Sequence, residues 1–500
     1  MPRYCFSRRS FLKAAGTVAG RSLLSSTNVF SQRAMVHPKG TVCQNNSTAD
    51  YDLTIAVKPI ELAPNRIISA TTYNGQFPGP LLRFAEGQQV TIDVHNQTDT
   101  PEQLHWHGQF VSADVDGAAE EGTPFIAPHG SRRISFIPRP SGYRFYHTHV
   151  HSGVDLSLGQ YSGLVGPVYI EPKNNPGNYD REAFLTLKEF EPRYSRGGDM
   201  AMDFLAPAAT VRSLKDAGEN AMKASLAKGM PHGFEVGYGS FTINGRMLGH
   251  GEPIRVKYGE RILLHVLNGS ATEIRSLALP GHTFTVIALD GNPIPKLIRA
   301  PGLWLGTAER VSAIVEMRHP GIWIMGDLAD DDRHHGMGIV VEYAGRKGTP
   351  QWIAPKPFRW NYAHFGNAGA SIPEPEEVFE MTFAKQNAAQ DGFNRWTINR
   401  VAFSRDRMQP MFRVKEGKRY RMRMRNASDD IHPIHLHRHS FELTRVAGQP
   451  TSGVMKDLVM VGGYQEVEVD FVANNPGLTL FHCHQQLHMD FGFMALVEYI

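Results

Sequence analysis

The sequence is poor in cysteine, in charge of one sign and in long apolar runs, and each shortage excludes a class of protein. Its 500 residues include three cysteines, Cys5, Cys43 and Cys483, which are too few for a disulfide-stapled scaffold. The formal net charge is +3 and basic runs with interleaved aromatics are missing, so we expect neither nucleic acid nor an anionic membrane as partner. Beyond the N-terminus, no apolar stretch is long enough for a membrane span.

The N-terminus carries the pattern of an export signal. The arginine pair Arg8-Arg9 precedes a mildly apolar segment from Ala14 to Leu24, which is typical of twin-arginine signals. We therefore interpret residues 1–31 as a signal peptide cleaved near Ser31. The expected partner is the twin-arginine translocation machinery, and the expected location of the mature protein is a bacterial periplasm or the exterior.

Glycine and proline are plentiful, at 48 and 32 residues, and one pattern built around them occurs three times. Each copy has a glycine, an alternating strand and, nine residues after the glycine, an asparagine. The three copies run from Gly87 to Asn96, from Gly259 to Asn268 and from Gly417 to Asn426. A second glycine followed by an apolar strand also recurs, at Gly142, Gly321 and Gly477.

These repeats predict three similar all-β domains, because alternating strands between glycine and proline turns build sandwiches. The expected bounds are 45–173, 174–348 and 349–500. Residues 195–233 fit neither repeat, since they hold Ala, Met and Lys at helical spacings, and they are interpreted as an insertion over one face.

The repeats align four His-x-His pairs. Nine residues after the repeat asparagine stand His105 and His107 in domain one, and His435 and His437 in domain three. Five residues after the second glycine stand His147 and His149, and His482 and His484. Domain two has leucine and other non-histidine residues at both places, so it is expected to act as a spacer.

A His-x-His pair on a strand places both imidazoles on one face, since side chains alternate with period two. One pair alone is more often a solvated strand face. Four pairs at equal offsets supply eight nitrogen donors, which fit three copper ions with positions left open for oxygen.

Cys483 lies between His482 and His484, so its thiolate points to the opposite face. His432, three residues before His435, and His488, five after Cys483, are available on that side. One cysteine with two histidines is the trigonal set of a blue-copper electron-transfer site. An electron accepted at Cys483 would pass through its backbone into the two flanking histidines.

These four segments resemble the four copper motifs of the multicopper oxidase family, over nearly all of the mature chain. The resemblance implies three cupredoxin-like Greek-key domains, in the arrangement found in laccases, and four copper ions as cofactors. It implies a type 2 copper held by His105 and His435, type 3 coppers held by His107, His147 and His484 and by His149, His437 and His482, and a type 1 copper held by His432, Cys483 and His488.

Two further positions have readings that depend on the resemblance. Asp116 fits a turn aspartate before Gly117, or the family's acidic residue that relays protons near the type 2 copper. Phe493, ten residues after Cys483, stands where many bacterial relatives have an axial methionine. A phenyl ring cannot coordinate, so a three-coordinate type 1 copper with a raised potential is expected.

Some residues near the motifs are expected to have no metal role. We interpret His151, His334, His335 and His439 as loop or surface residues. Met494 points to the other face if its segment is extended and is interpreted as core, and the methionines of the insertion as packing.

Three functions remain to be weighed. The first is a laccase-like oxidase that takes electrons from phenols or aromatic amines and passes them to O₂. The second is an oxidase of Cu(I) or another metal ion, contributing to copper tolerance. The third is an exported structural protein on the same fold, which the complete set of ten histidines and one cysteine disfavours.

Overall fold

The structure is a computed structural model that describes residues 48–175, 177–195, 210–230, 232–367, 369 and 371–500. The expected signal at 1–31 lies outside these residues, as do Cys5 and Cys43. From Ala49 to Ile500 the chain forms one compact unit. Within the described ranges, every helix is too short or too polar to cross a membrane.

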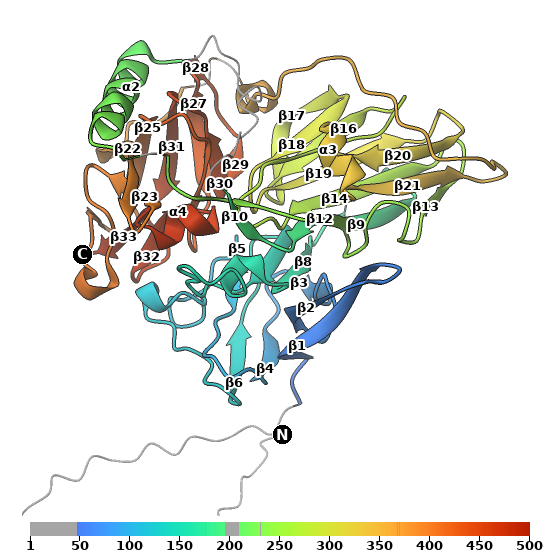
Figure 1. The fold of residues 1–500 in the computed structure, drawn as a ribbon, viewed down its shortest axis with the longest axis horizontal. Coiled ribbons are helices and arrows are strands. Elements are labelled where there is room, and N and C mark those ends of the chain that lie inside the picture. The colour runs from blue at the N-terminus through green and yellow to red at the C-terminus, as the bar shows by residue number, and fades with distance from the viewer. Residues whose placement is uncertain (1–47, 176, 196–209, 231, 368, 370) are drawn as a thin grey trace, which may run out of the picture. The chain divides into compact units, whose positions relative to one another are not determined.

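Three pairs of β-sheets follow one another along the described chain, and we call them domains one, two and three (Figure 1). In hydrogen-bonded order, one sheet of domain one contains β2 (Arg66–Tyr73), β1 (Tyr51–Ala63), β4 (Val90–Asn96) and β6 (Ser131–Phe136). The other contains β3 (Leu82–Ala85), β8 (Val165–Glu171), β7 (Gly142–His147) and β5 (His105–His107). The predicted all-β, cupredoxin-like class is confirmed.

The two sheets of domain two have more strands than those of domain one. The first contains β12 (Ser240–Ile243), β9 (Arg181–Phe190), β14 (Arg261–Asn268), β19 (Arg310–Glu316), β16 (Phe284–Leu289) and β17 (Asn292–Ala300). The second contains β13 (Ile254–Val256), β21 (Gly338–Tyr343), β20 (Ile322–Gly326), β15 (Arg275–Ala278) and β18 (Gly302–Leu305).

Domain three repeats the arrangement. Its first sheet contains β23 (Phe393–Ile398), β22 (Glu377–Gln390), β25 (Arg419–Asn426), β31 (Glu466–Val472), β27 (Phe441–Val446) and β28 (Gln449–Pro450), and β29 (Met455–Lys456) also pairs with β27. Its second sheet contains β24 (Phe412–Val414), β33 (Met494–Tyr499), β32 (Thr479–Cys483), β26 (His432–Leu436) and β30 (Leu458–Val461).

The repeated asparagine ends the same strand in each domain and is buried each time. Its amide donates to two or three backbone carbonyls, for example from Asn96 to Thr100, Ile126 and Ala127, and from Asn268 to Glu273 and Leu305. Its oxygen accepts the backbone N–H two residues on. Because one side chain satisfies several buried backbone groups, the asparagine fixes how the chain leaves the strand.

The repeated glycine precedes that strand in a left-handed conformation, with φ of 78°, 82° and 77° at Gly87, Gly259 and Gly417. Glycine adopts this conformation without the steric cost of a Cβ. The recurring glycine and asparagine therefore mark the two ends of one structural element, which occurs in all three domains.

The segment interpreted as an insertion contains α2 (Arg212–Ala227), although residues 196–209 and 231 within it lie outside the described residues. The helix packs on β22 of domain three (Figure 1). Gly218 fits closely there, since a Cβ would lie 2.5 Å from the Ala427 carbonyl oxygen. The remaining described connections include a two-stranded sheet, α-helices and 3₁₀ turns: β10 (Arg193–Ser195), β11 (Glu235–Gly237), α3 (Asp330–His334), α4 (Gln486–Asp490), and 3₁₀ turns at Ala119–Glu121, Gly159–Tyr161, Tyr362–Phe365 and Arg405–Arg407.

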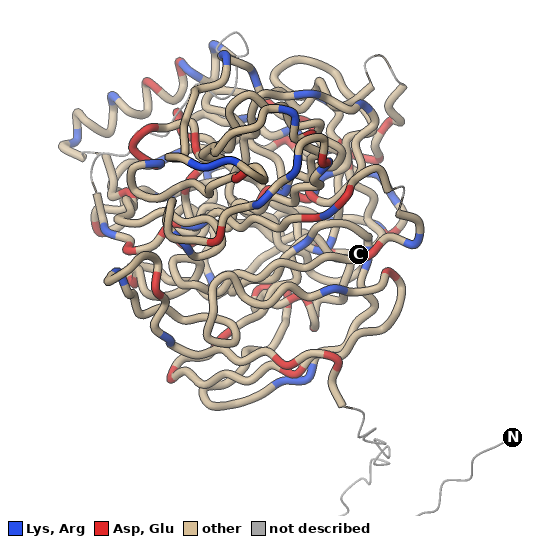
Figure 2. Tube along the Cα trace, turned by 90° about the vertical axis from the view of Figure 1, so that its right-hand side faces the viewer, with Lys and Arg blue, Asp and Glu red and all other residues tan. Residues whose placement is uncertain are grey.

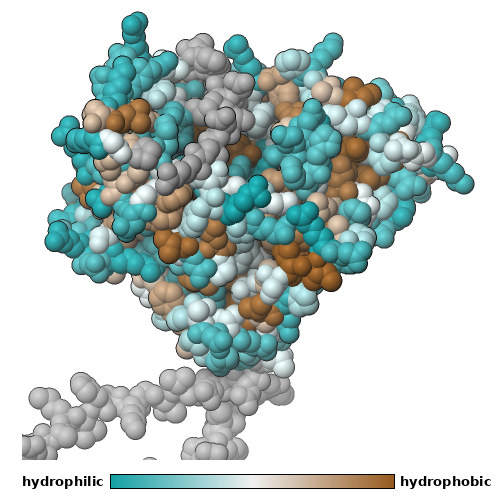
Figure 3. Space-filling view, in the orientation of Figure 1, coloured by the Kyte–Doolittle hydropathy of each residue, from teal (hydrophilic) through white to brown (hydrophobic). Residues whose placement is uncertain are grey.

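Charges of both signs are interspersed over the described chain in Figure 2, in line with the small net charge. On the face shown in Figure 3, apolar areas are small and separated by polar ones. This face therefore offers no large apolar patch, whereas the paired histidines are buried inside the molecule.

Candidate metal centre

Two neighbouring strands of domain one position its histidine pairs. β5 pairs with β7 so that His105 lies opposite His147, and His107 lies opposite Phe145. His149 follows at the end of β7. All four imidazoles are buried, although histidine is usually only partly buried in proteins.

Domain three uses the same pair of strands. β26 pairs with β32 so that His435 lies opposite His482, while Ile434 lies opposite Cys483. His435 and His482 therefore share one face of the sheet and Cys483 lies on the other. His437 and His484 follow directly after the two strands.

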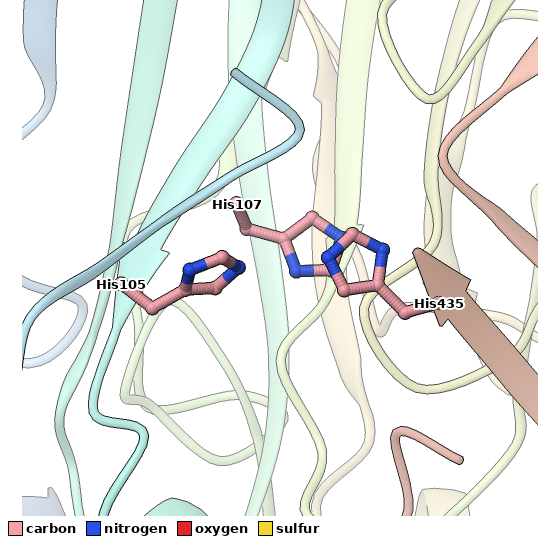
Figure 4. Close-up of side chains that lie close together, drawn as sticks. All are labelled: His105, His107 and His435. Atoms are coloured by element: carbon pink, nitrogen blue, oxygen red, sulfur yellow. The ribbon is translucent and has the colours of Figure 1, made fainter. Parts of the chain in front are cut away.

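The buried donors gather into groups whose ligand atoms lie within 4.8 Å of one another. His107 and His435, from different domains, stack with ring centroids 3.8 Å apart, and His105 lies beside them (Figure 4). The groups are His105, His107 and His435; His107, His147 and His484; His149, His437 and His482; His432, Cys483 and His488; and His105, Asp116 and His437.

The hydrogen bonds decide which nitrogen of several rings is free. His105 Nδ1–H donates to Asp116, and His435 Nδ1–H donates to the Asp457 carbonyl, 2.6 Å away. The Nε2 atoms of both rings are buried without a hydrogen-bond partner, as is His107 Nδ1. Unpaired buried nitrogens are costly unless something binds them, so they indicate a cation site.

A second feature points the same way. His437 Nδ1–H donates to Asp116, and His482 Nδ1–H donates to the Cys483 carbonyl. The two Nε2 atoms then carry lone pairs, yet they face each other at 3.0 Å. Two lone pairs at this distance repel, and a metal ion bound by both removes the repulsion. Burial also lowers the pKa of these rings, to about 3 for His482, which keeps them neutral and able to coordinate.

The other face of β32 forms a smaller site. Cys483 Sγ lies 3.8 Å from His432 Nδ1 and 3.5 Å from His488 Nδ1, and all three residues are buried. Burial raises the pKa of the Cys483 thiol, so a thiolate at this place needs a bound cation. Two imidazoles and one sulfur are a donor set suited to copper.

The predicted axial position is occupied by a ring. Phe493 is fully buried, and its ring lies edge-on to His432 with centroids 4.8 Å apart. Met494 pairs with His482 across β32 and β33, and its side chain belongs to a separate apolar cluster with Leu480 and Met489. That placement agrees with the interpretation of Met494 as core.

Asp116 joins the two domains at the histidine cluster. Its Oδ2 atom accepts from His105 Nδ1 at 3.0 Å and from His437 Nδ1 at 2.8 Å. Glu121, which the sequence did not single out, lies 3.6 Å from the same His437 nitrogen. Burial and the Asp116 carboxylate raise the pKa of Glu121.

Comparison with known families agrees with this geometry. Family profiles described as multicopper oxidase match residues 54–175, 214–341 and 373–499. The chain belongs to the multicopper oxidase family. Membership makes it a copper-dependent oxidoreductase.

Relatives of the oxidase include multicopper oxidase MmcO of Mycobacterium tuberculosis, 28% identical over 99% of this chain and 97% of that protein. A copper resistance protein A homolog of Pseudomonas syringae pv. tomato is 30% identical over 70% of this chain and 61% of that protein. The solved structure of Fet3p, a multicopper oxidase that functions in iron import, superposes with a TM-score of 0.70 at 18% identity, covering 90% of each chain.

The oxidase also contains a group that the sequence did not single out, Asp457. Its Oδ1 atom lies 3.1 Å from His107 Nε2, and its carboxylate is bound by Arg310 of domain two and by Arg144 of domain one. The sequence does contain a signal for it: the charged pair Lys456-Asp457 interrupts an apolar run. Charged residues are seldom buried without partners, so such a pair indicates a buried ion-pair network. Domain two therefore contacts the site through Arg310, a contact that the expected spacer role did not include.

Two of the histidines interpreted as loop or surface residues, His151 and His439, lie in loops as expected but are covered by other parts of the chain. His439 is buried, with its Nε2 atom 2.6 Å from the Tyr499 hydroxyl. His151 is largely buried and lies 3.3 Å from both Glu120 and Asp490. The C-terminal strand and the interface between domains one and three cover these rings, which no local pattern indicates. His334 and His335 are exposed, as expected.

Proposed function

We propose that this oxidase is laccase-like: it takes single electrons from phenols or aromatic amines and reduces O₂ to two waters. The observation that carries the proposal is Cys483, whose sulfur faces His432 and His488 while its flanking histidines enter the interdomain cluster. Bound copper supplies the one-electron chemistry, as one type 1, one type 2 and two type 3 ions. The ligands are those given by the resemblance.

The chain's own residues supply the connection between the two sites. His482 and His484 adjoin Cys483 directly, and His482 Nδ1–H donates to the Cys483 carbonyl at 2.9 Å. This short covalent and hydrogen-bonded path links the single-copper ligands to the cluster ligands. The surrounding burial excludes water from the path.

Protons must also reach the cluster, since reducing one O₂ to two waters consumes four. Asp116 already accepts hydrogen bonds from ligands on both sides of the interface, and its Oδ1 atom is buried without a partner. We therefore propose Asp116 as the residue that holds and passes protons beside the type 2 ligand His105.

The reductant site is proposed from a cavity of about 550 Å³ between α2 and the sheet of domain three. Ser428 lines it, and His432 Nε2 lies 3.0 Å from the Ser428 hydroxyl. The cavity is thus one hydrogen bond from a proposed type 1 ligand. The ring at Phe493 in place of an axial donor favours a high potential, which suits oxidation of phenols.

A second candidate, oxidation of Cu(I), is favoured by what lines the same cavity. Asp429 offers a carboxylate and Met222 a thioether, a soft ligand suited to Cu(I). A relative is named as a copper resistance protein A homolog, and we extend that role to this chain only as a proposal.

Two experiments test these proposals. Copper-loaded protein should be intensely blue with a near-ultraviolet shoulder, and a colourless protein would overturn the oxidase proposal. O₂ uptake is then compared with a dimethoxyphenol and with Cu(I) as reductant. If phenol oxidation requires added Cu²⁺, or if Asp429→Asn slows Cu(I) turnover while Asp216→Asn on α2 does not, the metal-ion oxidase is favoured.

The axial assignment has its own test. Phe493→Met should lower the type 1 reduction potential, because a thioether donor stabilises the oxidised ion. The measurement is a redox titration of the blue absorption. An unchanged potential would show that residue 493 is not the axial position.

A further inference from the structure

A buried charge network joins all three domains behind the histidine cluster. Arg310, at the start of β19 in domain two, is fully buried, and its guanidinium makes a two-pronged contact with the Asp457 carboxylate of domain three. The Nη1–Oδ1 distance is 2.8 Å. Such paired contacts fix both the position and the orientation of a carboxylate.

Asp457 in turn orients two proposed ligands from different domains, His107 and His435, through hydrogen bonds. Its Oδ1 atom accepts from His107 Nε2–H at 3.1 Å, and its backbone carbonyl accepts from His435 Nδ1–H at 2.6 Å. Both rings are thereby held in the tautomer that leaves the opposite nitrogen free. Those nitrogens, His107 Nδ1 and His435 Nε2, are both buried without a hydrogen-bond partner.

The fit around this contact is tight. A Cβ at Gly108 would lie 2.4 Å from Asp457 Oδ2 and 2.7 Å from Arg310 Nη2. Arg144 Nη1 lies 3.3 Å from Asp457 Oδ2, so all three domains touch one carboxylate. Beside it Lys456 pairs with Asp290 and Glu309 of domain two, each at 2.8 Å. Asp457 therefore has little room to turn away from Arg310.

We propose that Arg310 is a positioning residue for the trinuclear copper site, acting through Asp457 on His107 and His435. Domain two then has a role in assembling the site although it provides none of the proposed ligands. The inference rests on the proposed function, because it assumes that the cluster binds copper.

The test compares Arg310→Met with Arg275→Met. Arg275 is a matched control, since it is also a buried arginine of domain two but pairs with Asp332, at 2.6 Å, away from Asp457. We expect Arg310→Met to keep the blue absorption and to lose the near-ultraviolet shoulder and the type 2 electron paramagnetic resonance signal. Copper affinity at the cluster should fall roughly 10-fold to 100-fold, measured as copper per chain in dialysis series.

Arg310→Lys covers the case in which the methionine variant does not fold. Lysine keeps the charge but not the paired geometry, so we expect partial copper retention and an altered type 2 hyperfine splitting. A type 2 spectrum and copper content equal to the unmodified protein in either folded variant, or an equal loss in Arg275→Met, would overturn the inference. If the unmodified protein itself binds no copper, the proposed function fails instead, so the two failures are distinguishable.

Discussion

Domains two and three share one arrangement of strands but differ in what those strands carry. Where domain three has His435 and His437, domain two has Leu277 and Leu279, which are buried in an apolar cluster. The strand registers differ by one residue: His435 lies opposite His482, whereas Gly326, which holds the place of His482, lies opposite Ala278 and not opposite Leu277. At these places domain two therefore differs from domain three both in its side chains and in how the two strands pair.

The difference also shows what a ligand position requires. The histidines of domain three face histidines of domain one, and Asp116 and Asp457 hold them across the interface. Leu277 and Leu279 instead belong to an apolar cluster of buried residues. A metal centre of this kind needs two histidine-bearing domains in contact, together with carboxylates that fix the rings.

The largest expected effect comes from Cys483, a proposed copper ligand in domain three that has no counterpart in domain one. Cys483→Ser should abolish the blue absorption and reduce oxidase activity to background, because a serine oxygen cannot replace the thiolate at copper. Copper at the cluster should remain, since its histidines lie on the other face of β32. Absorption spectra and copper analysis provide the measurement, with Cys43→Ser as control; a blue Cys483→Ser protein would contradict the assignment.

The comparison can be broken by placing histidines in domain two. The double substitution Leu277→His, Leu279→His should lower the free energy of unfolding by about 3–6 kcal/mol, because it buries two polar rings without partners. It should bind no additional copper. Denaturant unfolding and metal analysis check both points, with Leu226→His on exposed α2 as control. Extra bound copper would show that the backbone alone suffices.

A smaller effect is expected at the residue that joins domains one and three. Asp116→Asn keeps the shape but removes the negative charge, so the hydrogen bonds from His105 and His437 become weaker neutral ones. Copper affinity of the cluster and O₂ turnover should fall roughly 10-fold to 100-fold. Equilibrium dialysis and O₂ uptake measure this, with the exposed neighbour Asp114→Asn as control. Equal values for the two variants would leave Asp116 as a simple turn residue.

The smallest effect concerns a turn that all three domains share. Asn74-Gly75 and Asn244-Gly245 have positive φ at both residues, and domain three has Asn399-Arg400, with φ of 68° at Arg400. Arg400→Gly should stabilise the protein by about 0.5–1 kcal/mol, since glycine removes the strain of a left-handed arginine. Thermal unfolding measures the change, and Gly75→Arg should act in the opposite direction. A destabilised Arg400→Gly would show that the arginine side chain outweighs the strain.

The strands and the ligand pairs could be predicted because both depend on local spacing. Each predicted repeat strand is present, ending at Asn96, Asn268 and Asn426. Side chains alternate along a strand, so the sequence predicts that Cys483 and His482 point to opposite faces. The strand register agrees with this prediction. By contrast, Arg310 and Asp457 are 147 positions apart, and no spacing rule connects them.

The sequence by itself therefore determined the all-β repeats, the four histidine pairs and the cysteine between two of them. Those features arise from periodicities of two residues and from equal offsets in repeated segments. Only the tertiary structure decided which carboxylates orient the rings, that His439 is buried and that Arg310 of domain two reaches the site. These contacts depend on how the domains pack, and packing joins residues with no relation along the chain.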